Sequence, residues 1–184
     1  MTKAVGRYQY RGCKKVRPLV SALVLALSAT GSWADRYSDC SQGKDPDRLI
    51  RGCTQVIERG EKETRKNRAS AYNNRGFAYY GKGDLNRAIA DYDKAIALNP
   101  KSTLAYYNRG LAYDQKGDLN RAIADYDKAI KIDPNDALAY NNRGAVYYGM
   151  GEVDQAIADL RKVLEINPSH QGAKEGLKRL GVTP

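Results

Sequence analysis

Side chains that carry most enzyme chemistry are scarce in this chain of 184 residues, which has one histidine, three cysteines and two methionines. The single histidine, His170, follows a proline-containing turn, and no Ser or Cys forms a local catalytic signature with it. Glycine is frequent, but each Lys-Gly-Asp or Met-Gly-Glu falls at an expected turn between helices, so no phosphate-binding loop is present. The sequence therefore predicts no catalytic residue, no metal site and no cofactor.

Residues 1–34 lack acidic side chains and also lack an apolar run long enough to cross a bilayer. The apolar run at 19–29 is shorter than the roughly 20 residues that a spanning helix needs. Six basic residues precede it, and Ser32-Trp33-Ala34 follows as a small-x-small cleavage site, so the segment resembles a secretory signal peptide. We expect cleavage after Ala34, export to a periplasm and no membrane insertion afterwards. An uncleaved membrane anchor and an organelle transit peptide are the alternatives.

The net charge of +10 would ordinarily raise nucleic acid as a partner. Six of the 31 basic residues lie in residues 1–34, however, which leaves 25 basic against 21 acidic residues and a net charge of +4. The remainder of the chain is nearly balanced. We therefore expect no nucleic-acid partner.

A period of 34 residues organises the chain from Ala69 to His170. Residues 71–98 and 105–132 agree at 22 of 28 positions, and residues 139–166 follow the same register with more substitutions. Self-similarity at this period is typical of a helix-turn-helix solenoid. Three copies of one unit are therefore present.

Each unit has the pattern of two packed helices. Tyr72, Gly76 and Tyr79 share one face of the first helix, and a second apolar stripe follows in the second helix. Gly83 suits a left-handed stop, and Asp84 can cap the next helix. One such hairpin cannot bury its own apolar face, so neighbouring hairpins must stack.

The repeated residues resemble the tetratricopeptide repeat. The resemblance implies an all-α fold, a right-handed helix-turn-helix solenoid with three full units at 69–102, 103–136 and 137–170. A degenerate hairpin and charged connector at 35–68 would precede them, and a capping helix and tail at 171–184 would follow. The residues that carry the resemblance are Tyr72, Gly76, Tyr79, Ala88, Tyr92, Ala95 and Pro100; Tyr106, Gly110, Tyr113, Ala122, Tyr126, Ala129 and Pro134; and Tyr140, Gly144, Tyr147, Ala156, Leu160, Val163 and Pro168.

Two cysteines, Cys40 and Cys53, would remain after cleavage. An even number in an exported chain suggests a disulfide, and two free thiols are the alternative. In register with the repeats, Cys40 falls at the position of Tyr79 and Cys53 at that of Tyr92. These positions face each other across the helix pair in the family, so the resemblance implies a Cys40–Cys53 disulfide that staples the degenerate hairpin. The pair also makes the chain look like small secreted proteobacterial members.

The resemblance further implies a concave face that binds extended or helical peptides. Aromatic rings among asparagines suit this task, because rings bury area while amides bond to backbone groups. Alternatively, several of these rings pack inside the solenoid. The expected peptide-binding residues are Asn73, Phe77, Tyr80, Leu104, Tyr107, Asn108, Leu111, Asp114, Leu138, Asn141, Ala145 and Tyr148.

One specialised group within the family clamps a carboxyl-terminal carboxylate with Lys, Asn and Arg side chains at five positions. Only one of the five corresponding residues here has the matching type, so this clamp is not expected. The five residues are Asn73, Phe77, Asn108, Leu138 and Asn142, of which Asn108 matches.

An arginine ladder, Arg75, Arg109 and Arg143, occupies the position where the family most often has Leu. Each guanidinium could pair with an aspartate of the adjacent helix, at 91, 125 or 159, or the row could bind an anionic ligand. We favour the pairing. The function that we expect is that of a noncatalytic scaffold for a protein or peptide. The alternatives are an accessory protein that binds a small anionic ligand or the cell wall through the ladder, and a regulatory subunit of an enzyme encoded elsewhere.

Overall fold

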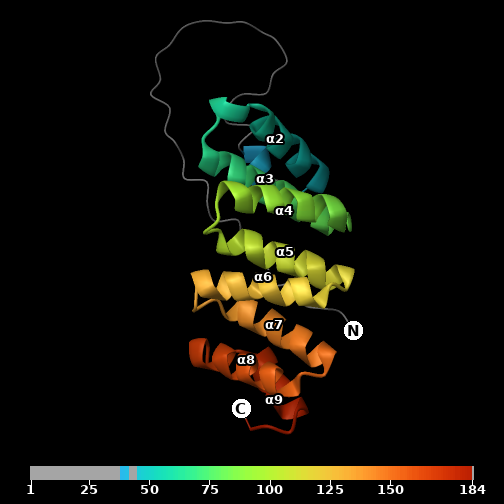
Figure 1. Ribbon diagram of the computed structural model, residues 1–184, viewed down its shortest axis with the longest axis vertical. Coiled ribbons are helices and arrows are strands. Elements are labelled where there is room, and N and C mark those ends of the chain that lie inside the picture. The colour runs from blue at the N-terminus through green and yellow to red at the C-terminus, as the bar shows by residue number, and fades with distance from the viewer. Residues whose placement is uncertain (1–37, 42–44, 184) are drawn as a thin grey trace, which may run out of the picture.

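The computed structural model describes residues 38–41 and 45–183, and within them the regular structure is helical throughout. The predicted signal peptide lies outside the described residues. Residues 38–41 form one helical turn, and the later helices stack in sequence along one long axis (Figure 1). The helices are α2 (Pro46–Glu58), η1 (Gly60–Lys62), α3 (Arg65–Gly81), α4 (Leu85–Leu98), α5 (Thr103–Lys116), α6 (Leu119–Ile132), α7 (Ala137–Met150), α8 (Val153–Ile166) and α9 (Gln171–Arg179).

The turn inside each repeat follows from its glycine and its acidic cap. Gly83 has a φ of +77°, a left-handed conformation that favours glycine because it has no Cβ. The Asp84 carboxylate then accepts a hydrogen bond of 3.0 Å from the Arg87 backbone N–H and so caps α4. Both features confirm the sequence prediction, and they fix the chain reversal between the two helices.

The helices form two layers. Within repeats α3 packs on α4, α5 on α6 and α7 on α8, while α3 also contacts α5 and α5 contacts α7. Close approach depends on small residues, since a Cβ added to Gly110 would lie 2.8 Å from Cε1 of Tyr126. Tyr126 itself is fully buried. Glycine and tyrosine therefore complement each other in volume, as their spacing predicts.

The N-terminal unit is a shortened hairpin that carries the cysteine pair. The Sγ atoms of Cys40 and Cys53 lie 2.11 Å apart, at disulfide distance, with the Cα atoms 4.6 Å apart. Both residues are buried in a cluster with Leu49, Val56 and Ala71. Because Ala71 belongs to α3, this unit packs directly on the first full repeat.

The connector before the first repeat is partly helical. Thr64 accepts a hydrogen bond of 3.1 Å from the Asn67 backbone N–H, and α3 begins at Arg65, four residues before the predicted boundary at Ala69. At the other end, α9 packs on α8 and fully buries Ala173 and Leu177. Within the described residues, no helix combines the length and apolar character needed to cross a bilayer.

Candidate functional site

The residues expected to bind a peptide lie on α3, α5 and α7, and α5 contacts both α3 and α7. We call the side chains at the four matching positions of these helices the candidate strip. Its members are Ser70, Asn73, Phe77 and Tyr80 on α3; Leu104, Tyr107, Leu111 and Asp114 on α5; and Leu138, Asn141, Ala145 and Tyr148 on α7.

Burial divides the strip into a floor and an accessible surface. Asn73 and Tyr107 are only 6% and 4% exposed, and the neighbouring Asn108 is 6% exposed. Most other members are half-buried, whereas Tyr148 is 59% exposed. A ligand would therefore meet the half-buried and exposed members and not the buried ones.

Tyr107 is buried because both ends of its side chain are engaged. Its ring centroid lies 6.0 Å from that of Tyr126 in a tilted arrangement, and its hydroxyl accepts a hydrogen bond of 2.7 Å from Nδ2 of Asn142. The ring thus packs in the core between α5 and α6. For Tyr107, the structure therefore agrees with the alternative that rings of the expected binding site pack inside the solenoid.

Asparagines at one position of each repeat link successive units. Nδ2 of Asn108 donates to Oδ1 of Asn73 over 3.1 Å, and Nδ2 of Asn74 donates to the Cys40 carbonyl over 2.8 Å. With the bond from Asn142 to Tyr107, the asparagine at this position of each repeat donates a side-chain hydrogen bond to the unit before it. Sequence reasoning missed this asparagine ladder, although the 34-residue spacing of 74, 108 and 142 signalled it.

Two members of the arginine ladder, Arg109 and Arg143, donate hydrogen bonds to carboxylates from all three guanidinium nitrogens. Arg109 donates from Nε and Nη2 to both carboxylate oxygens of Asp125 over 2.7 and 2.6 Å, and from Nη1 to Asp93 of the preceding repeat over 2.5 Å. Arg143 repeats the arrangement with Asp159 and Asp127. Each of these two arginines therefore joins two repeats through three charge-assisted hydrogen bonds, the strong class of hydrogen bond.

The arginine ladder ends differently on its two sides: one acceptor is a hydroxyl at the N-terminal end, and a leucine replaces arginine at the C-terminal end. Arg75 makes the bidentate pair with Asp91, but its Nη1 donates to the Thr54 hydroxyl over 2.9 Å instead of to a second carboxylate. At the C-terminal end, Leu177 stands 34 residues after Arg143 and is fully buried. The cap is thus joined by apolar burial in place of charge. The aspartates within each repeat were predicted from the sequence as partners of the arginines, and those of the preceding repeat were not.

The electrostatic consequence is a set of stable positive charges. Burial opposes the charge of Arg109, but hydrogen bonds to Asp125 and Asp93 outweigh burial and raise its pKa. For Arg143 the hydrogen bond to Asp159 is the leading cause of a raised pKa. Arg109 also lies over the rings of Tyr106 and Tyr113, with Cζ 5.7 and 5.9 Å from their centroids. These guanidinium groups are therefore engaged in contacts within the fold.

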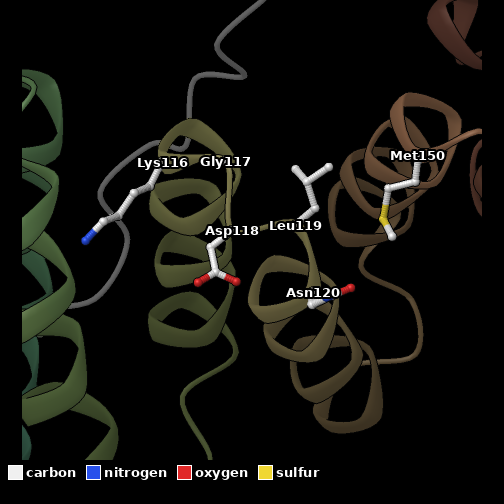
Figure 2. A pocket seen from close by; sticks show the side chains of 6 residues that line it. All are labelled: Lys116, Gly117, Asp118, Leu119, Asn120 and Met150. Atoms are coloured by element: carbon white, nitrogen blue, oxygen red, sulfur yellow. The ribbon is translucent and has the colours of Figure 1, made fainter.

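Shallow crevices recur at the turns between helices, at the edge of the solenoid. Figure 2 shows one, which is lined by residues of the α5–α6 turn, among them Asp118, and by Met150 at the end of α7. An equivalent crevice one repeat earlier is bordered by Lys82, Asp84 and Lys116. Asp84 and Asp118 already cap helices, so these crevices reflect the repeat geometry.

Exposed apolar side chains gather near one end of the strip. Among the described residues, four large hydrophobic side chains are exposed, and Tyr148, Met150 and Val153 lie around the α7–α8 turn. Ile132 is the fourth and belongs to α6. The sequence analysis named Tyr148 and missed Met150 and Val153, whose exposure depends on the turn between the helices.

The single histidine has a structural contact in the described part of the chain. His170 accepts a hydrogen bond of 3.1 Å at Nδ1 from the Ala173 backbone N–H and so caps α9. No group of three or more His, Cys, Asp or Glu side chains in that part of the chain could hold a metal ion. The accessible side chains of the candidate strip are mostly apolar, with aromatic rings, the Asn141 amide and the Asp114 carboxylate among them.

Solved structures that resemble the chain include the following three. The Arabidopsis OM64 TPR domain has 30% sequence identity and a TM-score of 0.62, over 64% of this chain and 98% of that one. MamA has 29% identity and a TM-score of 0.64, over 75% and 80%. The first TPR of Spaghetti (RPAP3), bound to the HSP90 peptide SRMEEVD, has 25% identity and a TM-score of 0.61, over 63% and 92%.

Family models agree with the observed helix pairs. A model described as TPR repeat matches residues 78–117 and 112–151, and one described as Tetratricopeptide repeat matches residues 137–170. No curated protein matches the sequence. Such domains are typically noncatalytic modules for protein–protein interaction. Because the matched residues span half of the chain and each full repeat forms the expected helix pair, the chain belongs to the tetratricopeptide-repeat family.

Proposed function

We propose that this protein is a noncatalytic scaffold that binds a protein or peptide along the candidate strip. One observation carries the proposal: Tyr148 is 59% exposed, at the end of a strip whose other accessible side chains are largely apolar. Apolar surface of this kind usually marks an interaction site. Half-buried Phe77, Tyr80 and Leu111 extend the surface across the first two repeats.

The residues of this chain do not match the family's carboxylate clamp, so we do not propose that binding mode. Asn108, the one matching residue, is buried and donates to Asn73, while Phe77 and Leu138 stand where cations or amides would be needed. The HSP90 peptide seen with the Spaghetti domain is therefore not the ligand that we propose.

The arginine ladder gives little support to an anionic ligand. Each guanidinium donates to two acceptors, and Asp125 and Asp159 are almost fully buried beside Arg109 and Arg143. A ligand anion would have to displace a bidentate carboxylate, whose loss would leave a buried charge uncompensated. The proposed function therefore uses the strip and not the ladder.

A pull-down of partners from the protein's own source tests the proposal. The informative variant carries Leu111→Ala and Tyr148→Ala, because both side chains are accessible and neither makes an inter-repeat hydrogen bond among the described contacts. Tyr107→Ala would instead damage the core. Ile132→Ala, which removes an exposed side chain of the other helix layer, is the matched control. Circular dichroism should first show that all variants fold.

We expect the parent and the Ile132→Ala control to capture the same protein, and the double variant to lose it. Capture that survives the double variant would place binding elsewhere on the molecule and contradict the proposal. A captured enzyme whose activity changes on binding would identify the protein as a regulatory subunit acting through the same surface.

We also propose that the protein is exported and acts in a periplasm. The support is the basic, acid-free start of the chain, its apolar run and the small-x-small site before Asp35, together with a cysteine pair suited to an oxidising compartment. Intact-mass analysis of the exported protein should find an N-terminus at Asp35. A chain that keeps residues 1–34 in the membrane fraction would favour the anchor instead.

A further inference from the structure

The hydroxyl group of Tyr126 is buried and lacks a hydrogen-bond partner among the described residues. Tyr126 belongs to α6 in the second repeat, and its side chain is fully buried. Buried hydroxyl groups almost always form a hydrogen bond, because a group without one loses its bonds to water and gains none in return. The hydroxyl therefore destabilises the unliganded fold, and its presence requires an explanation.

Packing alone does not account for this hydroxyl. The hydroxyl of the nearby Tyr107, by contrast, accepts a hydrogen bond of 2.7 Å from Nδ2 of Asn142. In the third repeat, the position that matches Tyr126 holds Leu160, which has no polar side-chain atom. An apolar residue can thus occupy this position of the unit, so the hydroxyl is not needed to fill the core.

The hydroxyl end of Tyr126 lies against α5. A Cβ added to Gly110 would lie 2.8 Å from Cε1 of Tyr126 and 3.2 Å from Cζ, the carbon that carries the hydroxyl. On the same helix, Tyr107 and Leu111 belong to the strip and pack in the cluster that contains Tyr126. The hydroxyl therefore lies beneath the strip, in its middle repeat.

The electrostatic surroundings of Tyr126 agree with this position. Burial is the leading cause that raises its pKa, followed by the charge of Asp114 and the phenol groups of Tyr107 and Tyr80. All three of these residues are members of the strip. Because the pKa is raised, the hydroxyl keeps its proton well above neutral pH and is available as a hydrogen-bond donor.

The kind of acceptor follows from burial. A charged acceptor would lose its hydration at a buried site, whereas a neutral carbonyl oxygen loses far less. Two strip members, Leu111 and Leu138, pack half-buried against the same cluster. Interface side chains of this kind commonly change rotamer when a partner binds. The covering side chains are therefore ones that can move.

We propose that the Tyr126 hydroxyl donates a hydrogen bond to a carbonyl oxygen of the peptide bound along the strip, and that it is uncovered when Leu111 turns aside. The carbonyl belongs to the peptide backbone or to an Asn or Gln side chain, which offer the same acceptor. This site rests on the function proposed above and specifies one contact of its ligand.

A peptide selected from a random display library on the immobilised full chain is the probe. Its affinity is measured for the parent, for Tyr126→Phe and for Tyr113→Phe. Tyr113 belongs to the same cluster but not to the strip, so its variant is the matched control. We expect about tenfold weaker binding by Tyr126→Phe, the size of one hydrogen bond made by an otherwise unpaired donor, and unchanged binding by Tyr113→Phe.

Urea unfolding of the unliganded variants gives a second readout. Tyr126→Phe should have a midpoint equal to or above that of the parent, because it removes a buried donor without a partner. Tyr107→Phe should have a lower midpoint, because its hydroxyl accepts from Asn142. A midpoint of Tyr126→Phe as low as that of Tyr107→Phe would show that the fold itself uses the hydroxyl, and would overturn the site.

Modified peptides distinguish the two sources of the carbonyl. If Asn or Gln is enriched at one position, its replacement by leucine should abolish the affinity difference between the parent and Tyr126→Phe. Without such enrichment, replacement of one peptide bond by an ester, whose carbonyl is a weaker acceptor, should reduce that difference. If no modification reduces the difference, the proposed hydrogen bond does not form.

The two proposals fail in different ways. Equal affinity of the selected peptide for the parent and Tyr126→Phe, with binding still lost in the Leu111→Ala and Tyr148→Ala variant, contradicts the Tyr126 site alone. Equal losses in Tyr126→Phe and Tyr113→Phe mark general damage to the core and also overturn that site. A selected peptide that binds the double variant as tightly as the parent contradicts strip binding and the Tyr126 site together.

Discussion

Arg109→Ala is the perturbation that the structure defines most sharply. Arg109 joins Asp125 in its own repeat to Asp93 in the preceding one, so its removal breaks three charge-assisted hydrogen bonds at once. Its side chain is 20% exposed, while that of Asp125 is only 5% exposed. The variant therefore leaves a buried carboxylate without its counter-charge.

The expected magnitude follows from that burial. Removal of one partner of a buried ion pair costs about 3 to 5 kcal/mol, because the remaining charge stays desolvated. Asp93 adds little, since its side chain is 50% exposed and water can replace the arginine. We expect a loss near the lower bound, about 3 kcal/mol in the free energy of unfolding. Binding by the folded variant should be unchanged.

Urea unfolding followed by far-UV circular dichroism measures this loss. Arg87→Ala is the matched control, because its pair with Asp84 is exposed and should contribute far less. Replacement of both buried partners, Arg109→Leu with Asp125→Leu, should recover most of the loss. If Arg109→Ala costs no more than Arg87→Ala, the arginine ladder does not hold the repeats together.

Three further predictions concern the N-terminal staple, a packing contact and a cap. Cys40→Ser with Cys53→Ser should lower the free energy of unfolding by about 3 kcal/mol, because the cross-link restricts the unfolded chain, and urea midpoints equal to the parent's would contradict this. Gly110→Ala should lower the free energy of unfolding by about 1 to 3 kcal/mol, because the added methyl group meets the Tyr126 ring. Gly149→Ala, whose added methyl group would have nothing within 4 Å, should cause no loss, and equal melting temperatures of the two variants would contradict the contact. The pKa of Asp84 is lowered, first of all by the hydrogen bond from the Arg87 backbone N–H. The stabilisation that Asp84 contributes is therefore present above its unfolded pKa near 4, and it is lost as the pH falls through the lower pKa of the folded state. Asp84→Asn should keep the cap and reduce the loss of unfolding free energy in acid. Parallel profiles of unfolding free energy against pH for the parent and the variant would contradict this role of Asp84.

The fold was largely predictable because the repeat supplies the same information three times. The Gly83 turn, the Asp84 cap and the contact of Gly110 with Tyr126 each follow from residue type at a fixed spacing. The start of α3 at Arg65 was not predicted, since Thr64 caps it outside the repeated pattern. Local capping chemistry decides such boundaries more than periodicity does.

The candidate site was predictable by position but not by exposure. The helix face that contains Tyr107 and Tyr148 follows from the register, yet one ring is buried and the other is 59% exposed. The two rings stand at different positions of the unit: Tyr107 packs on Tyr126 and accepts from Asn142 of the next repeat, whereas Tyr148 lies near the end of α7 in the last full repeat. Contacts between repeats, which no single unit encodes, set this outcome.

Amide chemical-shift mapping of the chain, titrated with a selected peptide, tests the central claim most directly. Binding along the strip predicts shift changes that follow α3, α5 and α7 and centre on Leu111, Asp114 and Tyr148, with α4, α6 and α8 little affected. Changes confined to α4, α6 and α8 at saturating peptide would contradict the account.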